Sequence, residues 1–204
     1  MARMTGAGAL LMAMTAVFLS SSAALTAPAS ALSMRTGGVT SQPIGHYQFC
    51  QKNRRECSSI RNANPAKVTA VGWRVIRDVN ASVNRAIRPV TDRELFGRDE
   101  LWTYPNGAGD CEDFVLLKRK KLMERGFAAA DLLITVVRKP DGEGHAVLTV
   151  RSSEGDFILD NLENVVKLWS ETPYRYLKRQ ASFHAGRWVS IENGDTMMVS
   201  AVGK

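Results

Sequence analysis

The spacing of apolar residues changes part-way along the chain, and this change limits the folds open to it. Between residues 66 and 88, apolar side chains recur at three- or four-residue steps, which is the spacing of one face of an α-helix. The series comprises Val68, Val71, Val75, Val79, Val83 and Ile87. Pro89 follows this series, and proline cannot continue a helix because it lacks a backbone N–H. We therefore expect a long amphipathic helix that ends before Pro89.

After Gly126 the pattern becomes typical of β-strands. Three runs are rich in apolar and β-branched residues, and turn-forming residues separate them. The runs are residues 132–137, 145–150 and 157–162, and the turns are residues 140–142 and 152–155. Such short runs joined by tight turns predict an antiparallel meander. A helical segment followed by these strands predicts an α+β fold.

Two further segments give local predictions. Asn193–Gly194 favours a tight two-residue turn, so we expect a hairpin over residues 188–202. The basic run Lys118–Lys121 covers most of a helical turn, and we expect it to face solvent.

The composition is that of a globular protein, with 45% hydrophobic and 23% charged residues. The formal net charge of +7 is spread along the chain, and no motif typical of nucleic-acid binding accompanies it. We therefore expect no nucleic-acid partner.

Residues 1–31 have the pattern of a secretory signal peptide. Arg3 is their only charged residue, an apolar stretch runs from residue 7 to residue 25, and Ala29–Ala31 supplies small residues for cleavage. We expect a periplasmic or secreted mature protein. No later segment is apolar and long enough to cross a bilayer, so we expect no integral membrane protein after cleavage.

Residues 32–65 lack a clear apolar period, and we expect them to form an extended arm on a domain made by residues 66–204. Cys50 and Cys57 lie seven positions apart in this arm. An oxidising compartment favours a disulfide between them, and a metal-binding or redox pair is the alternative. Their pairing would leave Cys111 as a free thiol.

Cys111 lies where a helix is expected to begin, because the turn-rich segment 102–109 precedes it and apolar residues at helical spacing follow. The partial positive charge of a helix N-terminus stabilises a thiolate and so lowers the pKa of a thiol. A buried cysteine without a chemical role is the alternative. The neighbouring carboxylates of Asp110, Glu112 and Asp113 favour a helix start near the surface.

A nucleophilic thiol needs a base, and His145, one of three histidines, begins an expected strand. A turn centred on Ser152–Ser153 would place His145 directly opposite Asp160, whereas a Ser153–Glu154 turn would make the two residues diagonal neighbours on one face. An aspartate there would orient the imidazole and stabilise its protonated form. Taken alone, a structural histidine and a turn-capping aspartate are the alternatives.

Three short segments carry a resemblance to a known family. They are Gly109–Phe114 (GDCEDF), Gly144–Ala146 and Leu159–Asn161. With this spacing the chain resembles the bacterial transglutaminase-like cysteine proteinases. The resemblance implies a papain-like, transglutaminase-type fold, with a cysteine at a helix N-terminus packed on an antiparallel sheet. It also implies a triad in which Cys111 is the nucleophile, His145 the general base and Asp160 the residue that orients the base.

The same resemblance implies a calcium ion bound with the help of Asp110 and Glu112. Calcium prefers six to eight oxygen ligands, so further groups would have to complete the shell. Capping of the helix by Asp110 is the alternative. The resemblance further implies a protein substrate such as a surface adhesin, and control by an inner-membrane cyclic di-GMP receptor. The residues themselves identify neither partner.

Two other functions fit the same residues. An amine that intercepts the thioester would make the protein a transglutaminase, which transfers the acyl group instead of hydrolysing it. A catalytically silent, calcium-dependent binding module on the same fold is the other alternative. The leading interpretation is an exported cysteine endopeptidase.

Overall fold

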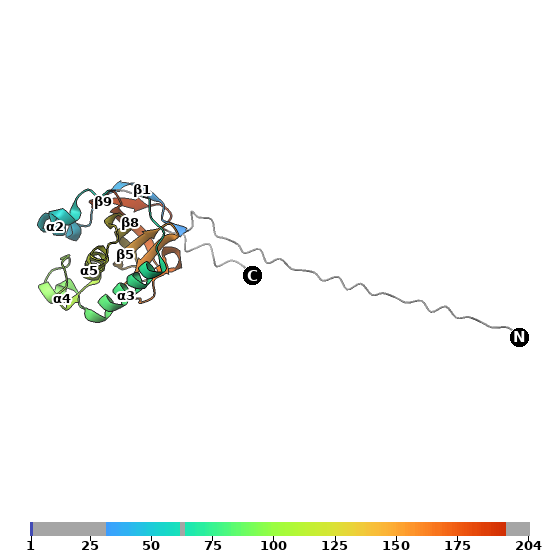
Figure 1. Cartoon of the computed structure of the whole chain (residues 1–204). Coiled ribbons are helices and arrows are strands. Elements are labelled where there is room, and N and C mark those ends of the chain that lie inside the picture. Colours follow the sequence, from blue (N-terminus) through green and yellow to red (C-terminus); the bar gives the residue numbers. More distant parts are fainter. Residues whose placement is uncertain (2–31, 62–63, 195–204) are drawn as a thin grey trace.

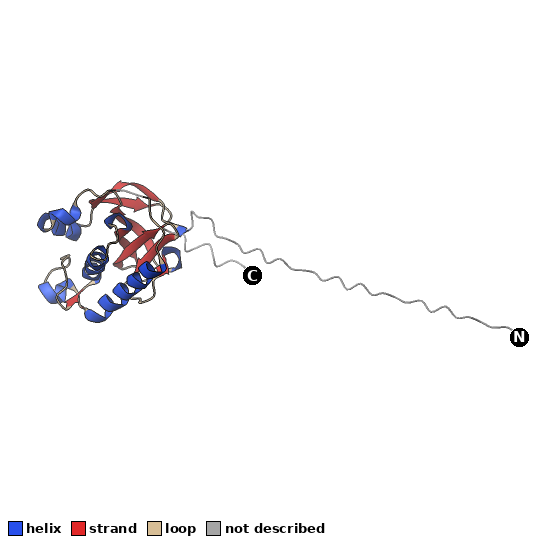
Figure 2. Cartoon of the chain, viewed as in Figure 1, coloured by secondary structure: helices blue, strands red, loops and turns tan. Residues whose placement is uncertain are grey.

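The computed structural model describes residue 1, residues 32–61 and residues 64–194. In chain order the elements are β1 (Thr36–Thr40), α2 (Ile44–Lys52), η1 (Arg54–Cys57), α3 (Ala70–Ala86), β2 (Arg88–Pro89), α4 (Asp92–Phe96), β3 (Ala108–Gly109), α5 (Cys111–Met123), η2 (Ala129–Asp131), β4 (Leu132–Arg138), β5 (Gly144–Ser152), β6 (Gly155–Leu159), β7 (Lys167–Leu168), η3 (Trp169–Glu171), β8 (Arg175–Ala181) and β9 (His184–Ile191). Seven strands form one sheet in the order β1-β9-β8-β4-β5-β6-β7 (Figure 1). The helices lie around this sheet, which gives the expected α+β class (Figure 2).

The predicted long helix is α3. Its N-cap residue is Thr69, whose side chain accepts a hydrogen bond from the backbone N–H of Gly72 at 3.1 Å. The helix ends at Ala86, before Pro89, as expected. Among the described residues, no helix combines the length and hydropathy of a membrane span.

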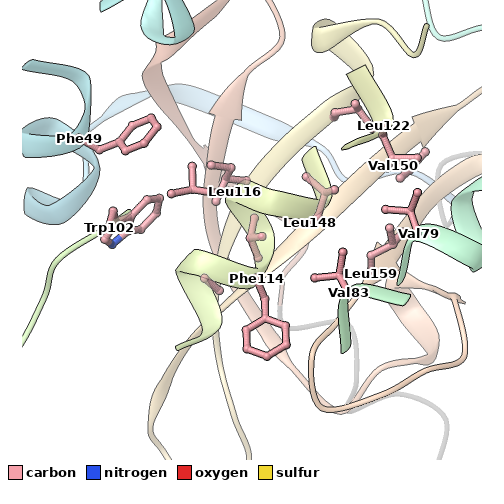
Figure 3. Packing of buried hydrophobic residues seen from close by; sticks show 14 of the residues in the cluster. Phe49, Val79, Val83, Trp102, Phe114, Leu116, Leu122, Leu148, Val150 and Leu159 are labelled. Carbon is pink, nitrogen blue, oxygen red and sulfur yellow. The ribbon is translucent and has the colours of Figure 1, made fainter. Parts of the chain in front are cut away.

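A buried cluster joins α3 and α5 to one face of the sheet (Figure 3). Phe114 and Leu122 of α5 are at most 2% exposed, and they share this cluster with Val83 of α3 and Leu148 of β5. Burial of each such side chain stabilises the fold by roughly 1.5–3 kcal/mol. The packing therefore holds the whole length of α5, and with it the first residue, Cys111, at a fixed place on the sheet.

A second buried cluster covers the other face of the sheet. Neighbouring residues of a strand point to opposite faces, so Val147 lies in this cluster whereas Leu148 lies in the first. The other members of the second cluster include Val137, Ile158, Trp169, Tyr174 and Tyr176. The loop between β6 and β8 thus packs back on the sheet through its aromatic residues.

The prediction that Lys118–Lys121 faces solvent is wrong for two of its residues. Lys118 is fully buried and Arg119 is 4% exposed. The reason is that α5 packs against both α3 and the sheet, which leaves it little free surface. The Arg119 Nε–H donates to the carbonyl oxygen of Leu132 at 3.0 Å. Among the described residues, the Lys118 Nζ has no hydrogen-bond partner.

The predicted meander is present as β4, β5 and β6, but the turn between β5 and β6 differs from the first expectation. Ser152 pairs with Gly155, so the turn is centred on Ser153–Glu154 instead of Ser152–Ser153. The Ser152 hydroxyl donates to the Gly155 carbonyl oxygen at 2.9 Å and accepts from the Glu154 N–H at 3.1 Å. Gly155 has a φ of +131°, a conformation that side chains disfavour. These local features fix the turn.

The expected extended arm contains regular structure. Its strand β1 pairs with β9 at one edge of the main sheet, and helix α2 follows. The buried residues of α2 are Gly45, His46, Phe49 and Cys50. Gly45 and His46 interrupt the apolar spacing, so the helix was not expected from the sequence. The Cα atoms of Cys50 and Cys57 are 5.6 Å apart, with the sulfur atoms at bonding distance.

The expected hairpin over residues 188–202 is not formed at residues 188–191. Those residues belong to β9, and both edges of β9 are occupied, by β1 on one side and by β8 on the other. Residues 195–202 lie outside the described residues. Instead, β9 forms a hairpin with the preceding strand, β8, which turns at residues 182–183.

Candidate active site

Cys111 is the first residue of α5, as expected. The short parallel pair of β2 and β3 leads into this helix, and the Val90 N–H donates to the Gly109 carbonyl oxygen at 3.0 Å. Asp110 occupies the N-cap position but makes no capping hydrogen bond with its side chain. Capping therefore does not explain why an aspartate precedes Cys111.

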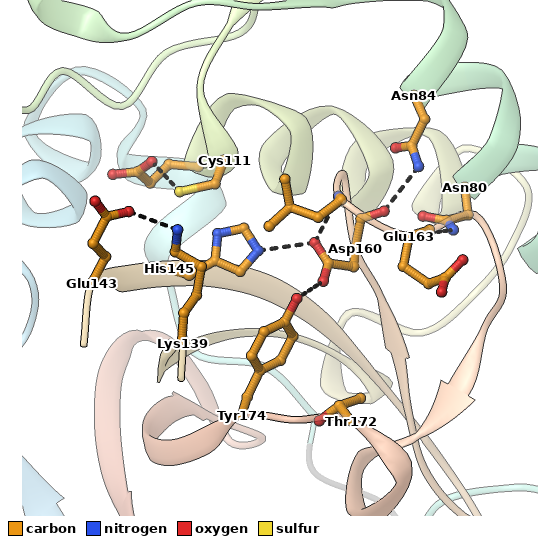
Figure 4. Close-up of polar contacts among 12 residues, drawn as sticks. Asn80, Asn84, Cys111, Lys139, Glu143, His145, Asp160, Glu163, Thr172 and Tyr174 are labelled. Atoms are coloured by element: carbon orange, nitrogen blue, oxygen red, sulfur yellow. Dashed lines mark hydrogen bonds and ion pairs between the residues drawn. The ribbon is translucent and has the colours of Figure 1, made fainter. Parts of the chain in front are cut away.

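His145 and Asp160 lie at the same end of the sheet as Cys111 (Figure 4). His145 is the second residue of β5, and Asp160 directly follows β6, which runs antiparallel to β5. The turn at Ser153–Glu154 makes His145 and Asp160 the diagonal neighbours expected from that register. Both side chains are buried, with 6% and 4% exposure.

A hydrogen bond of 2.9 Å joins His145 Nε2 to Asp160 Oδ1. Burial alone would raise the pKa of Asp160, but bonds from His145, Leu162 and Tyr174 and the charge of His145 hold that pKa below its usual value. The carboxylate is therefore ionised at neutral pH and can only accept, so the Nε2 carries the hydrogen. In a neutral imidazole this leaves Nδ1 as an acceptor.

The Cys111 thiol donates to Glu112 Oε2 at 2.8 Å. Burial raises the pKa of Cys111 well above its ordinary value, and the neighbouring Glu112 and Asp110 carboxylates raise it further, whereas the backbone N–H of Ala146 lowers it. The structure thus contains a protonated thiol beside a carboxylate. In Figure 4 the His145 ring lies between Cys111 and Asp160.

These residues open into a cavity of about 260 Å³. Its wall comes from the arm, from the segment before α5 and from the sheet, and comprises Pro43, Glu100, Trp102, Cys111, Glu112, Val136, Gly144, His145, Ala146 and Lys178. The Cys111 thiol and the His145 imidazole therefore line the same cavity. The sequence did not predict that the arm and β8 would line it, because only the folded sheet brings them there.

The arm is held at this cavity by polar and steric contacts. The Lys178 ammonium donates to the Ser41 carbonyl oxygen at 2.8 Å, which ties β8 to the residues before α2. A Cβ at Gly45 would lie 2.3 Å from an atom of the Trp102 ring, so only glycine allows α2 to approach Trp102 this closely.

A group of carboxylates lies next to Cys111. One oxygen each from Asp92, Asp110 and Asp113 lies within 4.8 Å of the others. Burial, followed by the charge of Glu112, raises the pKa of Asp110 to about 7. Burial and the neighbouring carboxylates likewise raise the pKa of Asp113 to about 8. Close, buried carboxylates of this kind favour either protonation or a bound cation.

The unpartnered oxygens of this group fit a cation. Asp92 Oδ1, Asp110 Oδ1 and Asp113 Oδ2 are buried without a hydrogen-bond partner among the described residues. Hard carboxylate oxygens are the ligands that calcium prefers. Of the two expected ligands, Asp110 belongs to this group, whereas Glu112 contacts the thiol. The helical spacing of Asp113 from Asp110 could have indicated it, but no local pattern connects Asp92 to this group.

Comparison with known proteins identifies the family of the chain. The model of the bacterial transglutaminase-like cysteine proteinase family, BTLCP, matches residues 36–196. The calcium-bound structure of Legionella pneumophila LapG is 26% identical, with a TM-score of 0.49 over 65% of this chain and 81% of that chain. The EGTA-treated structure of the same protein is 27% identical, with a TM-score of 0.51 over 62% of this chain and 71% of that chain.

The comparison with curated proteins gave no match. The family model nevertheless spans most of the chain, from β1 to beyond β9. Its match includes Cys111, the cavity that surrounds this thiol, and the sheet end that carries His145 and Asp160. The chain therefore belongs to the bacterial transglutaminase-like cysteine proteinases and is a cysteine protease of that family.

Proposed function

We propose that this protease cleaves peptide bonds with a triad formed by Cys111, His145 and Asp160. The proposal rests on the buried hydrogen bond between His145 and Asp160, which lies beside the Cys111 thiol at the N-terminus of α5. Asp160 fixes the imidazole so that Nδ1 is free to accept a proton. To react, the thiol turns from Glu112 towards His145.

The steps follow from these roles. His145 takes the thiol proton, and the Cys111 sulfur attacks the peptide carbonyl carbon. The free N–H groups of the first turn of α5 stabilise the negative oxygen that forms. Protonated His145 then donates its proton to the leaving amine as the C–N bond breaks, which leaves a thioester. Water, activated by His145, hydrolyses the thioester and restores the thiol.

We propose that Asp92, Asp110 and Asp113 hold a calcium ion, with Glu112 beside them. Three buried carboxylate oxygens without partners support this site, and the similar LapG has been studied after treatment with EGTA, a calcium chelator. Calcium there would supply positive charge next to the thiol and would replace the protons that the carboxylates otherwise retain.

We also propose that the protein is exported and that Cys50 and Cys57 form a disulfide. The signal-like residues 1–31 and the distance between the two cysteines support these assignments. By the family resemblance, the proposed substrate is a periplasmic or surface protein such as an adhesin, and the proposed regulator is an inner-membrane cyclic di-GMP receptor.

A peptide library tests the proposal without knowledge of the natural substrate. The mature protein is incubated with peptides derived from a whole proteome, with calcium or with EGTA, and new N-termini are identified by mass spectrometry. We expect cleavage that is absent in Cys111→Ala and His145→Ala and that calcium increases. Cleavage that persists in Cys111→Ala would overturn the triad. Incorporation of an added amine without cleavage would instead identify acyl transfer.

A further inference from the structure

Tyr174 lies between η3 and β8, and its side chain reaches the buried end of the proposed triad. Its hydroxyl donates to Asp160 Oδ2 at 2.5 Å. The centroid of its ring lies 5.6 Å from that of His145, with the two planes at 61°. Tyr174 is 7% exposed. One side chain therefore contacts both the aspartate and the histidine, as Figure 4 shows for the aspartate.

The two oxygens of Asp160 have different partners. Oδ1 accepts from His145 Nε2 at 2.9 Å and from the Leu162 N–H at 3.0 Å. Oδ2 accepts from the Tyr174 hydroxyl. The Tyr174 bond thus fixes the rotation of the carboxylate, because rotation about the Cβ–Cγ bond that moved Oδ1 away from His145 would also break the bond to Tyr174. Without the hydroxyl, a buried carboxylate oxygen would lose its donor and the carboxylate would reorient.

Both Asp160 and Tyr174 border a second cavity of about 210 Å³, which Thr172 and Pro173 also line. At the edge of this space the Tyr174 hydroxyl donates to Asp160 Oδ2. Water that entered through the cavity would compete for the carboxylate and weaken its bond to the imidazole.

We propose that Tyr174 is a positioning residue of the protease: it holds the Asp160 carboxylate in the orientation that accepts the His145 Nε2–H. This rests on the proposed function, in which His145 acts as the general base. Tyr174 does not line the cavity that contains the Cys111 thiol, so it acts through Asp160. Its loss should lower the turnover number and leave substrate binding unchanged.

The neighbouring Tyr176 provides a matched control. It is also a buried tyrosine of the second cluster, at 2% exposure. Its hydroxyl bonds to the Thr172 hydroxyl at 2.8 Å, and its ring packs on Trp169. Tyr176→Phe therefore removes one buried hydroxyl from the same region and leaves the hydrogen bonds of Asp160 in place.

The experiment compares Tyr174→Phe, Tyr176→Phe and the wild type in the mature protein with calcium. The first readout is the proton resonance of His145 Nε2–H, assigned by its absence in His145→Ala, which reports the bond to Asp160 without any substrate. The second is kcat and KM on a fluorogenic peptide that carries a cleavage sequence from the library. Thermal unfolding shows whether each variant folds.

We expect the resonance to move upfield or to broaden in Tyr174→Phe, and kcat to fall about tenfold with KM unchanged, as for the loss of one hydrogen bond to a charged group. Tyr176→Phe should retain the resonance and kcat. A wild-type resonance and kcat in Tyr174→Phe would overturn the proposal, and so would an equal loss in Tyr176→Phe. A failure of the triad would show separately, as cleavage that survives Cys111→Ala, and the resonance would still decide what Tyr174 does.

Discussion

The side-chain amide of Asn84 donates to the backbone carbonyl oxygen of Asp160 at 2.9 Å, across 76 positions of sequence. Asn84 lies on the last turns of α3, and it also donates to the Asn164 side chain at 2.9 Å. The helix predicted from the apolar series thus holds the main chain of the loop that carries Asp160. Tyr174 restrains the side chain of Asp160, and Asn84 restrains its backbone.

Asn84→Ala should therefore affect both stability and catalysis. Removal of the amide should lower the free energy of unfolding by about 1 kcal/mol, the usual net contribution of such a bond. It should also lower kcat by about threefold to tenfold, because Asp160 can then shift away from His145. Urea unfolding and peptide cleavage measure the two effects.

Ser82→Ala is the control for Asn84→Ala. Ser82 lies on the same helix, but its hydroxyl donates to the Val79 carbonyl oxygen at 3.2 Å, within α3. This variant should keep the wild-type kcat. An equal loss of kcat in both variants would show that the helix as a whole, and not the contact with Asp160, determines the effect.

From the carboxylates beside Cys111 we predict that calcium changes how the free energy of unfolding depends on pH. Without calcium, burial and neighbouring charges raise the pKa of Asp110 to about 7 and of Asp113 to about 8, whereas an unfolded aspartate has a pKa of about 3.9. Between these values the folded chain binds more protons than the unfolded chain. Its free energy of unfolding therefore falls as pH rises from about 4 to about 8.

Thermal unfolding at several pH values, in EGTA and in excess calcium, tests this dependence. The melting temperature in EGTA should decrease towards pH 8, and calcium should reduce the decrease because it replaces the protons. Asp113→Asn should weaken the dependence in EGTA, since the amide does not ionise. Parallel pH profiles with and without calcium would contradict a cation site at these residues.

We predict that position 155 requires glycine. Its φ of +131° is rare for other residues, and an added Cβ would lie 2.7 Å from the Leu32 carbonyl oxygen. Gly155→Ala should lower the free energy of unfolding by about 1–3 kcal/mol, the cost of holding a side chain in such a conformation. Gly38→Ala is the control, because a Cβ there meets no atom within 4 Å. Equal midpoints in urea would refute this requirement.

Because Lys118 is buried, we predict that replacing it with an apolar residue stabilises the fold. Burial lowers its pKa to about 7, although the charge of Asp160 opposes this shift. An unfolded lysine keeps a pKa of about 10.4, so stability should rise with pH from about 7 to about 10. Lys118→Met should remove this rise and increase the free energy of unfolding at pH 7 by about 1 kcal/mol.

Denaturant unfolding at pH 7 and pH 9 measures both effects. A variant less stable than the wild type at pH 7 would show that the buried ammonium does not destabilise the fold.

The helices and strands that were predicted from the sequence are those indicated by the pattern of neighbouring residues. The apolar series of α3 and the alternation of β4, β5 and β6 each depend on neighbouring residues, and the structure contains them. Helix α2 has no such series, because Gly45 and His46 are among its buried residues, and His46 packs against Trp102 and Trp188. The register of β5 and β6 depends on the turn between them, in which Ser152 pairs with Gly155. Gly155 has a positive φ, which the sequence does not reveal.

The same distinction holds at the candidate site. Cys111, His145 and Asp160 are recognisable because a helix start, a strand start and a strand end are visible in the sequence. Tyr174 and Asp92 are not, because no spacing along the chain connects them to Asp160 or Asp110. Only the folded loops bring them to these partners.

The pairing of β1 with β9 joins the first and the last described strands of the sheet. β9 also forms the hairpin with β8, which carries Lys178 at the cavity. Among the described strands β1 has no neighbour other than β9, so the position of the arm beside the thiol depends on β9. A chain without β9 would therefore leave both the arm and β8, two parts of the cavity wall, without their shared partner strand.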